Sequence, residues 1–436
     1  MTGWIAPAAL ALLMASCGDG GAQPRSIALR LVLPVAPDPM AVVERLSLSA
    51  DQPEFGRVAA SFDADADRLE LPAIAPGEGW TFELAGHAGG AVIALGRTCP
   101  VDVPAAGEIP EIALPFALVR RFSAVGAPAH ERAAATLLPL EGGDLLVLGG
   151  APAERYRRDL AGFEPAQGPD GALVAAPLRD GAYLVVGEVG EAWMLAADGE
   201  ASPLGAVEPR AGSALAPLDD GRALLVGGVD ADGALRADTL VFDPSRREFL
   251  PGPALVASRR GATATAAPGG ALVVGGVGMK GAVVLVERVD AGGAEAIGTL
   301  AHGRAEHTAT VVGDALLVIG GRDADGVALA SVERVRPNEG RVEAVEPLPM
   351  PRFGHTATAL SDGRVLVAGG FEAGGTPIDR ALLWDQAEEG FLPTDRLLRA
   401  RGGHAAVVAC DGSVLFVGGV GMGADRGEIY EPAPLE

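Results

Sequence analysis

One short pattern occurs seven times between residues 145 and 419. Each copy is an apolar run that ends in a glycine pair, except one in which only the first glycine is present. The copies are LLVLGG at 145–150, YLVVGE at 183–188, ALLVGG at 223–228, ALVVGG at 271–276, LLVIGG at 316–321, VLVAGG at 365–370 and VLFVGG at 414–419. Their ends lie 38 to 49 residues apart, which is the period of a four-stranded blade and not of a helical hairpin or a short-rung solenoid. The repeat therefore predicts an all-β chain whose larger part is a seven-bladed β-propeller.

An arginine precedes most of these runs at a constant place, ten residues ahead of a turn. The six positions are Arg132, Arg210, Arg259, Arg304, Arg352 and Arg401. In two copies this arginine opens RAEHTAT and RFGHTAT, and later strands read LVFDP, LLWDQ and EIYEP. Together these motifs resemble the kelch repeat of the galactose-oxidase-like propellers over roughly residues 118–436. The second copy departs from the pattern, with Asp170 in place of the arginine and Glu188 in place of the second glycine.

The residues before the repeats have a different organisation. Residues 26–115 contain about seven short alternating strands separated by Pro, Gly and Asp, which predicts a small β-sandwich of immunoglobulin-like or transthyretin-like type. The propeller then takes residues 116–436. Its last blade reaches only a third strand near the end of the chain, so we expect the segment 116–125 to supply the fourth and close the ring.

The first residues resemble a bacterial lipoprotein signal. An apolar segment ends in Leu-Met-Ala-Ser-Cys, so residues 1–17 would form the signal, Cys17 the lipidation site and residues 18–25 a flexible tether. The resemblance implies a lipid-anchored protein of the outer membrane or cell surface; an ordinary secretory signal, with a periplasmic or secreted protein, is the alternative. Cys99 and Cys410 could form a disulfide in such a compartment or remain two separate buried thiols.

The chain is strongly acidic. Its 57 acidic and 34 basic residues give a formal net charge of −23, which repels nucleic acid and anionic lipid. We therefore expect no nucleic-acid partner and membrane contact only through the lipid anchor. We also expect a monomer.

Three histidines occupy one equivalent repeat position, at His307, His355 and His404. They could converge on a metal near the axis, but a repeat more often places each residue in contacts within its own blade. We favour the structural role and predict no metal site and no cofactor. The copper-radical oxidases of this propeller family need two tyrosines, one of them linked to a cysteine, and two histidines, an arrangement that this sequence does not repeat.

The resemblance also places the arginine segments and the loops after the glycine pairs on one face, where several family members bind ligands. The candidate ligand-binding residues are Arg132, Arg210, Arg259, Arg304, Arg322, Arg352, Phe371 and Arg401. A ring of arginines could hold a carboxylate or sulfate. The alternative is that each repeated arginine pairs with a carboxylate of its blade, such as Glu333 or Asp385, and we favour it because the residue recurs so regularly.

The sequence favours a non-catalytic binding or scaffold protein of the cell envelope with a protein or glycan ligand. The opposing hypothesis is a carbohydrate-active oxidase, epimerase or lyase that uses an acid and a histidine at the channel mouth. An enzyme should have a pocket where a histidine meets a carboxylate or tyrosine away from the repeated position. A purely structural envelope protein is a third possibility.

Overall fold

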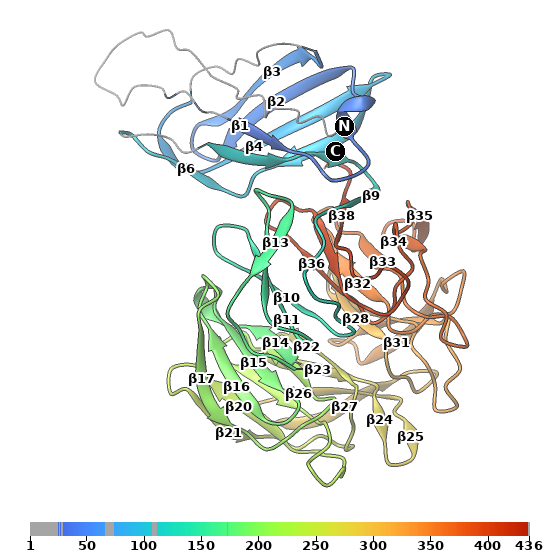
Figure 1. Ribbon diagram of the computed structural model, residues 1–436. Helices are drawn as coiled ribbons and strands as arrows, with labels where there is room; N and C mark the ends of the chain where they lie inside the picture. The colour runs from blue at the N-terminus through green and yellow to red at the C-terminus, as the bar shows by residue number, and fades with distance from the viewer. Residues whose placement is uncertain are drawn as a thin grey trace.

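The computed structural model describes residues 25, 27, 29–65, 74–106, 111–171 and 173–434. Its strands form a small domain from the first part of the chain and a ring of blades from the rest (Figure 1). This all-β architecture confirms the fold class predicted from the glycine repeat. Cys17 and the rest of the leader lie outside the described residues. Within those residues, no helix has the length and apolar character needed to cross a bilayer.

Two packed sheets form the N-terminal domain, as expected for a sandwich. The larger has the order β3-β2-β4-β5-β8, with β6 beside β4, and the smaller is a parallel pair of β1 and β7. Their bounds are β1 (Leu29–Val32), β2 (Arg45–Gln52), β3 (Gly56–Asp63), β4 (Gly77–Ala88), β5 (Ala91–Arg97), β6 (Val101–Val103), β7 (Ile112–Pro115) and β8 (Ala117–Leu118). A single-turn 3-10 helix, η1 (Pro39–Ala41), precedes β2.

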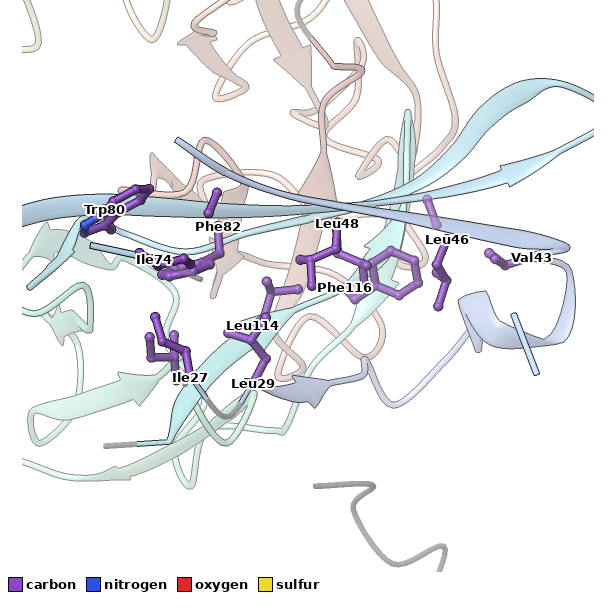
Figure 2. Packing of buried hydrophobic residues seen from close by; sticks show 14 of the residues in the cluster. Ile27, Leu29, Val43, Leu46, Leu48, Ile74, Trp80, Phe82, Leu114 and Phe116 are labelled. Atoms are coloured by element: carbon purple, nitrogen blue, oxygen red, sulfur yellow. The ribbon is translucent and has the colours of Figure 1, made fainter. Parts of the chain in front are cut away.

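The core of this domain lies between the two sheets (Figure 2). Leu46 and Leu48 alternate with serines along β2, so both leucines point to the same face of the sheet. They pack in one cluster with Phe82 of β4, Leu29 of β1 and Leu114 of β7. All five side chains are buried. The alternating apolar pattern read from the sequence is thus what holds the two sheets together.

The described residues of the propeller form seven four-stranded antiparallel sheets. Blade 1 comprises β10 (Thr136–Pro139), β11 (Leu145–Leu148), β12 (Glu154–Arg157) and β13 (Gly162–Pro165). Blade 2 comprises β14 (Leu173–Pro177), β15 (Tyr183–Gly187), β16 (Glu191–Leu195) and β17 (Ala201–Ala206), with a 3-10 turn η2 (Arg179–Gly181). Blade 3 comprises β18 (Ala214–Pro217), β19 (Ala223–Val226), β20 (Thr239–Asp243) and β21 (Glu248–Gly252).

The remaining blades follow the same order. Blade 4 comprises β22 (Thr263–Ala267), β23 (Gly270–Val274), β26 (Leu285–Asp290) and β27 (Gly293–Thr299), with a small hairpin of β24 (Val277–Gly278) and β25 (Gly281–Ala282). Blade 5 comprises β28 (Thr308–Val312), β29 (Ala315–Ile319), β30 (Val332–Arg336) and β31 (Arg341–Val345). Blade 6 comprises β32 (Thr356–Ala359), β33 (Val365–Ala368), β34 (Ala381–Asp385) and β35 (Gly390–Pro393). Blade 7 comprises β36 (Ala405–Val408), β37 (Val414–Val417), β38 (Glu428–Glu431) and β9 (Arg121–Ala124).

The first strand of each blade is the innermost one. These strands contact one another in circular order, and β36 of blade 7 returns to β10 of blade 1. The second strands, which carry the apolar runs of the repeat, are almost wholly buried between neighbouring blades. The ring is therefore held by the apolar faces of adjacent sheets.

The last blade is completed from the N-terminal side. β9 pairs antiparallel with β38, so that Phe122 lies opposite Tyr430. The segment 116–125, expected as a single strand, is in fact divided: β8 joins the sheet of the sandwich through β5, and only β9 belongs to the ring. Arg120 stands between the two with a φ of 57°, and this left-handed residue turns the chain from one sheet to the other.

Each glycine pair ends a second strand where backbones come close together. Gly369 and Gly370 have φ values of 61° and 99°, in the left-handed region that favours glycine. A Cβ on Gly369 would lie 2.5 Å from the carbonyl oxygen of Arg401 in the next blade. We call this end of the ring the glycine face; it consists of the segments leading into the innermost strands and the loops after the glycine pairs.

The sandwich packs against the opposite end, where turns join first and second strands. A disulfide joins Cys99, just after β5, to Cys410 in the turn between β36 and β37. Beside it, the buried carboxylate of Asp411 pairs with Arg158 of blade 1. Residues 35 and 36 also exchange backbone hydrogen bonds with Ala124 of the closing strand. These contacts leave the glycine face directed away from the sandwich, as the position of the β24–β25 hairpin illustrates (Figure 1).

Candidate functional site

The six repeated arginines lie inside the blades. Each is at most 2% exposed. Arg304 is representative: its guanidinium donates to the carbonyl oxygens of Gly320 at 3.0 Å and Ser331 at 3.1 Å, and it pairs with Glu333. The other pairs are Arg132–Glu154, Arg210–Asp238, Arg259–Glu287 and Arg401–Glu428. These side chains join the entry of the first strand to the third strand, and their guanidinium groups have no exposed surface for a ligand.

Blade 6 departs from this pairing. Arg352 donates to the carbonyl oxygens of Gly369 and Arg380, both at 3.0 Å, and no carboxylate of the described residues reaches it. Asp385, which the sequence suggested as its partner, instead accepts hydrogen bonds from the backbone N–H groups of Ala387 and Glu388. Burial, with a contribution from the positive charge of Arg380, lowers the pKa of Arg352 to about 10.

The repeated histidines bridge neighbouring blades. The Nε2 atoms of His307, His355 and His404 lie 3.1, 3.1 and 3.0 Å from threonine hydroxyls. These hydroxyls belong to Thr263, Thr308 and Thr356, each in the first strand of the preceding blade. The expectation of contacts within the same blade is corrected on this point, because the ring lies over the preceding blade's glycine pair. Burial first, and the adjacent arginine second, lower the pKa values of His307 and His404 to about 3.

These histidines should make the propeller sensitive to acid. The folded protein keeps them neutral, whereas the unfolded chain takes up protons below its ordinary pKa of about 6.5. Stability is therefore complete above pH 6.5 and falls by about 1.4 kcal/mol per pH unit for each histidine below it. Chemical unfolding between pH 7 and 5 measures this slope, and His307→Gln should reduce it. A histidine ring among the three that titrates by NMR between pH 6 and 7 would contradict the prediction.

Arg322 and Phe371 are the two candidates that lie outside the buried arginine set. Both follow a glycine pair and occupy equivalent positions, because Arg322 bridges Ala305 in blade 5 as Phe371 bridges Phe353 in blade 6. The rings of Phe353 and Phe371 lie 5.4 Å apart, centre to centre. The guanidinium carbon of Arg322 stands 5.1 Å from the centre of the Phe353 ring. The two predicted residues are thus brought together, and Phe353 joins them.

Glu306 completes this cluster. Its carboxylate pairs with Arg322, and the two side chains are 41% and 44% exposed. The ring of Phe371 is held against the backbone of Gly354 and Gly402, where a Cβ would clash with it at Gly402. We call Glu306, Arg322, Phe353 and Phe371 the arginine–phenylalanine platform. It combines two fixed aromatic rings with an exposed cation on the glycine face.

Phe353 was missed from the sequence although a signal was present. The residue directly after the repeated arginine is Ala, Ala, Arg, Ala and Gly in the other five copies. A large aromatic ring at this one position is a departure from the repeat. It could have been paired with Phe371, the other aromatic departure in the same blade.

Other groups with potential chemistry are engaged elsewhere. His130 lies 3.8 Å from a carboxylate oxygen of Glu154, but that carboxylate is bound to Arg132 and to the N–H of Ala129. The hydroxyl of Tyr430 is 2.9 Å from that of Thr394. Across the described ranges, no group of three or more His, Cys, Asp or Glu residues is arranged to hold a metal ion.

The repeat and the ring together define a seven-bladed β-propeller, and the platform is an exposed, non-repeating cluster on its glycine face. A model of the kelch motif matches residues 303–349, which span blade 5. Among solved structures, the fold is similar to a fungal alcohol oxidase of the AA5 family in complex with copper, with 16% identity and a TM-score of 0.57, covering 72% of this chain and 76% of that one.

A second similar structure is that of YjhT, with 17% identity and a TM-score of 0.49, covering 58% of this chain and 92% of that one. No curated protein matches the sequence. At these identities the likeness concerns the fold alone, because propellers of one fold host many unrelated functions.

Proposed function

We propose that this protein is a non-catalytic binding module of the bacterial cell envelope. Its glycine face binds a protein or glycan ligand through the arginine–phenylalanine platform. Two observations carry the proposal. The platform breaks the repeat and reaches the surface, with Glu306 and Arg322 exposed and Phe353 and Phe371 half-buried. The repeated arginines and histidines, in contrast, are buried and make contacts inside the ring. Residues that differ between blades, and not those that recur, are where a propeller acquires binding specificity.

The chemistry of the platform indicates the kind of ligand. Phe353 and Phe371 offer apolar ring surface that is held in place by neighbouring backbone, so little conformational entropy is lost on binding. Arg322 has a planar guanidinium that suits a carboxylate, and Glu306 accepts hydrogen bonds from hydroxyl or amide donors. A ligand with a flat apolar or sugar face beside a carboxylate would satisfy all four side chains.

An envelope location has two supports. The first is the lipoprotein-like leader with Cys17. The second is the disulfide between Cys99 and Cys410, because disulfides persist mainly in oxidising compartments. The sandwich lies between that leader and the ring in the chain, so it would hold the glycine face away from an anchoring membrane.

Alanine substitutions at the platform test the proposal. Protein lacking the leader is immobilised and exposed both to a glycan array and to solubilised host envelope. Arg322→Ala and Phe371→Ala should each weaken capture of the ligand by about tenfold or more, since anchor residues of this kind dominate binding energy. Arg246→Ala, an exposed arginine on the outer side of blade 3, should leave capture unchanged.

Two results would contradict the proposal. The first is a ligand retained equally by the wild type and both platform variants. The second is stoichiometric copper or zinc in the purified protein, because a bound transition metal would indicate an oxidase or another metal-dependent enzyme.

A further inference from the structure

The position three residues after each repeated arginine faces the preceding blade in blades 5, 6 and 7. In blades 5, 6 and 7 it is a histidine whose ring lies on the preceding blade. The ring of His307, for example, covers Gly275 and contacts Thr263 of blade 4. In blade 3 the same position is Ser213, and the equivalents of Gly275 and Thr263 in blade 2 are Gly187 and Val174. This serine, like Ala135 in blade 1 and Ala262 in blade 4, is too small to fill the space that an imidazole fills in blades 5, 6 and 7.

A cavity of about 190 Å³ includes this place and extends past the inner strand of blade 2 to blade 1, where Ala134, Ala135, Thr136 and Gly149 also line it. Leu173, Val174 and Val186 give it apolar walls, and Ser213 and Glu188 contribute polar groups. Its volume is smaller than the roughly 300 to 1,000 Å³ of sites for drug-sized ligands. The cavity therefore suits a single side chain or a small organic molecule.

Blade 2 places negative charge at the mouth of this cavity. Leu173 pairs with Gly187, so the segments carrying Asp170 and Glu188 leave the same end of the strand pair. Where other blades have an arginine and a glycine, blade 2 therefore has two acids. Both side chains are exposed, and neither forms an ion pair with any residue that the structure describes.

The loop on the glycine face is also shorter in blade 2 than in blade 5. In blade 2 only residues 188–190 join the second and third strands, whereas in blade 5 residues 320–331 do so. Val189, at the tip of the short turn, is 71% exposed. A ligand thus has direct access to the cavity past an apolar rim residue and Glu188.

From these observations we propose that the cavity lined by blades 1, 2 and 3 binds a primary alkylammonium group. The hydrocarbon chain packs on Leu173, Val174 and Val186, while the ammonium pairs with the carboxylate of Glu188. The hydroxyl of Ser213 provides a second acceptor. The net charge of −23 draws cations toward the protein. This inference deepens the proposed function and rests on it in one respect, the source of the ammonium group. That source is a lysine side chain of the partner protein, with a free amine as the alternative.

Ligand-observed NMR with the whole protein, sandwich and propeller together, tests the site without the partner. The probes are n-butylamine, n-butanol as its neutral counterpart, and Nα-acetyl-lysine N-methylamide. We expect both amines to bind, the alcohol to bind at least about tenfold more weakly, and Glu188→Gln to weaken amine binding by about tenfold. Ser213→His, which introduces the ring found in blades 5 to 7, should weaken amine binding by about tenfold or more because the ring would occupy the part of the cavity beside blade 3.

Control variants separate this site from the platform. Glu295→Gln removes an exposed carboxylate on the outer strand of blade 4 and should leave amine affinity unchanged. Arg322→Ala should also leave it unchanged even though it weakens capture of the partner. Tighter binding of the lysine derivative than of butylamine assigns the site to a lysine side chain, and the reverse order assigns it to a free amine. Equal amine binding by the wild type and Glu188→Gln, or no binding at all, overturns the proposal.

Discussion

Replacing Arg259 with methionine should lower the free energy of unfolding by about 3 to 5 kcal/mol. Its guanidinium is 0% exposed and pairs with Glu287, which is also fully buried. The substitution leaves that carboxylate in the protein interior without its countercharge. It also removes the donors to the carbonyl oxygens of Gly275 and Leu285, at 3.1 and 3.3 Å. Urea unfolding followed by circular dichroism measures the loss.

Blade 6 offers the matched control. Arg352→Met removes an equally buried arginine but leaves no buried carboxylate without a countercharge. Only backbone acceptors lose their partner, so the decrease in the free energy of unfolding should be smaller. The double variant Arg259→Met with Glu287→Leu should regain part of the stability, because it removes both members of the charge pair. Equal losses for Arg259→Met and Arg352→Met would show that the ion pair contributes nothing beyond the carbonyl contacts.

Replacing Cys99 and Cys410 with serine should lower the free energy of unfolding by about 5 kcal/mol, since the stabilisation by a cross-link grows with the length of the loop that it closes. Here the two cysteines are 311 residues apart, and the loop includes almost the whole propeller. The cross-link therefore restricts the unfolded chain strongly. Denaturant unfolding of the wild type and of the double variant measures the difference.

A reducing agent provides the internal control for the disulfide. It should destabilise the wild type to the level of the double serine variant and leave that variant unchanged. If the reduced wild type and the oxidised wild type unfold at the same denaturant concentration, the disulfide does not contribute to stability.

The number and order of the blades could be predicted because each copy carries its own signal, an apolar strand followed by glycines that backbone crowding requires. The division of residues 116–125 between two sheets could not. It depends on a left-handed turn at Arg120, and arginine has no preference for that conformation that a sequence would reveal. The pairing of Cys99 with Cys410 likewise depends on how two domains dock, which spacing along the chain does not encode.

The candidate site was partly predictable for the same reason. Regular recurrence indicated that the arginines pair inside their blades, and Glu333 was correctly named as a partner of this kind. The contacts of the histidines with preceding blades were missed, because the sequence gives a residue's place in its repeat but not the stacking of one sheet on the next. The departures at Glu188, Arg322 and Phe371 were visible, whereas the cavity and the ring stacking around them required coordinates.

Closure of the ring by β9 has a consequence for biosynthesis. β9 is among the first strands of the ring to leave the ribosome, and its partner β38 is the last. The disulfide of Cys99 likewise cannot form until Cys410 has been synthesised. Domains that emerge early usually fold before the rest of the chain is made, but this propeller cannot close until nearly all of it has been synthesised. Its nascent chain therefore carries one open β-strand edge from the first blade to the last.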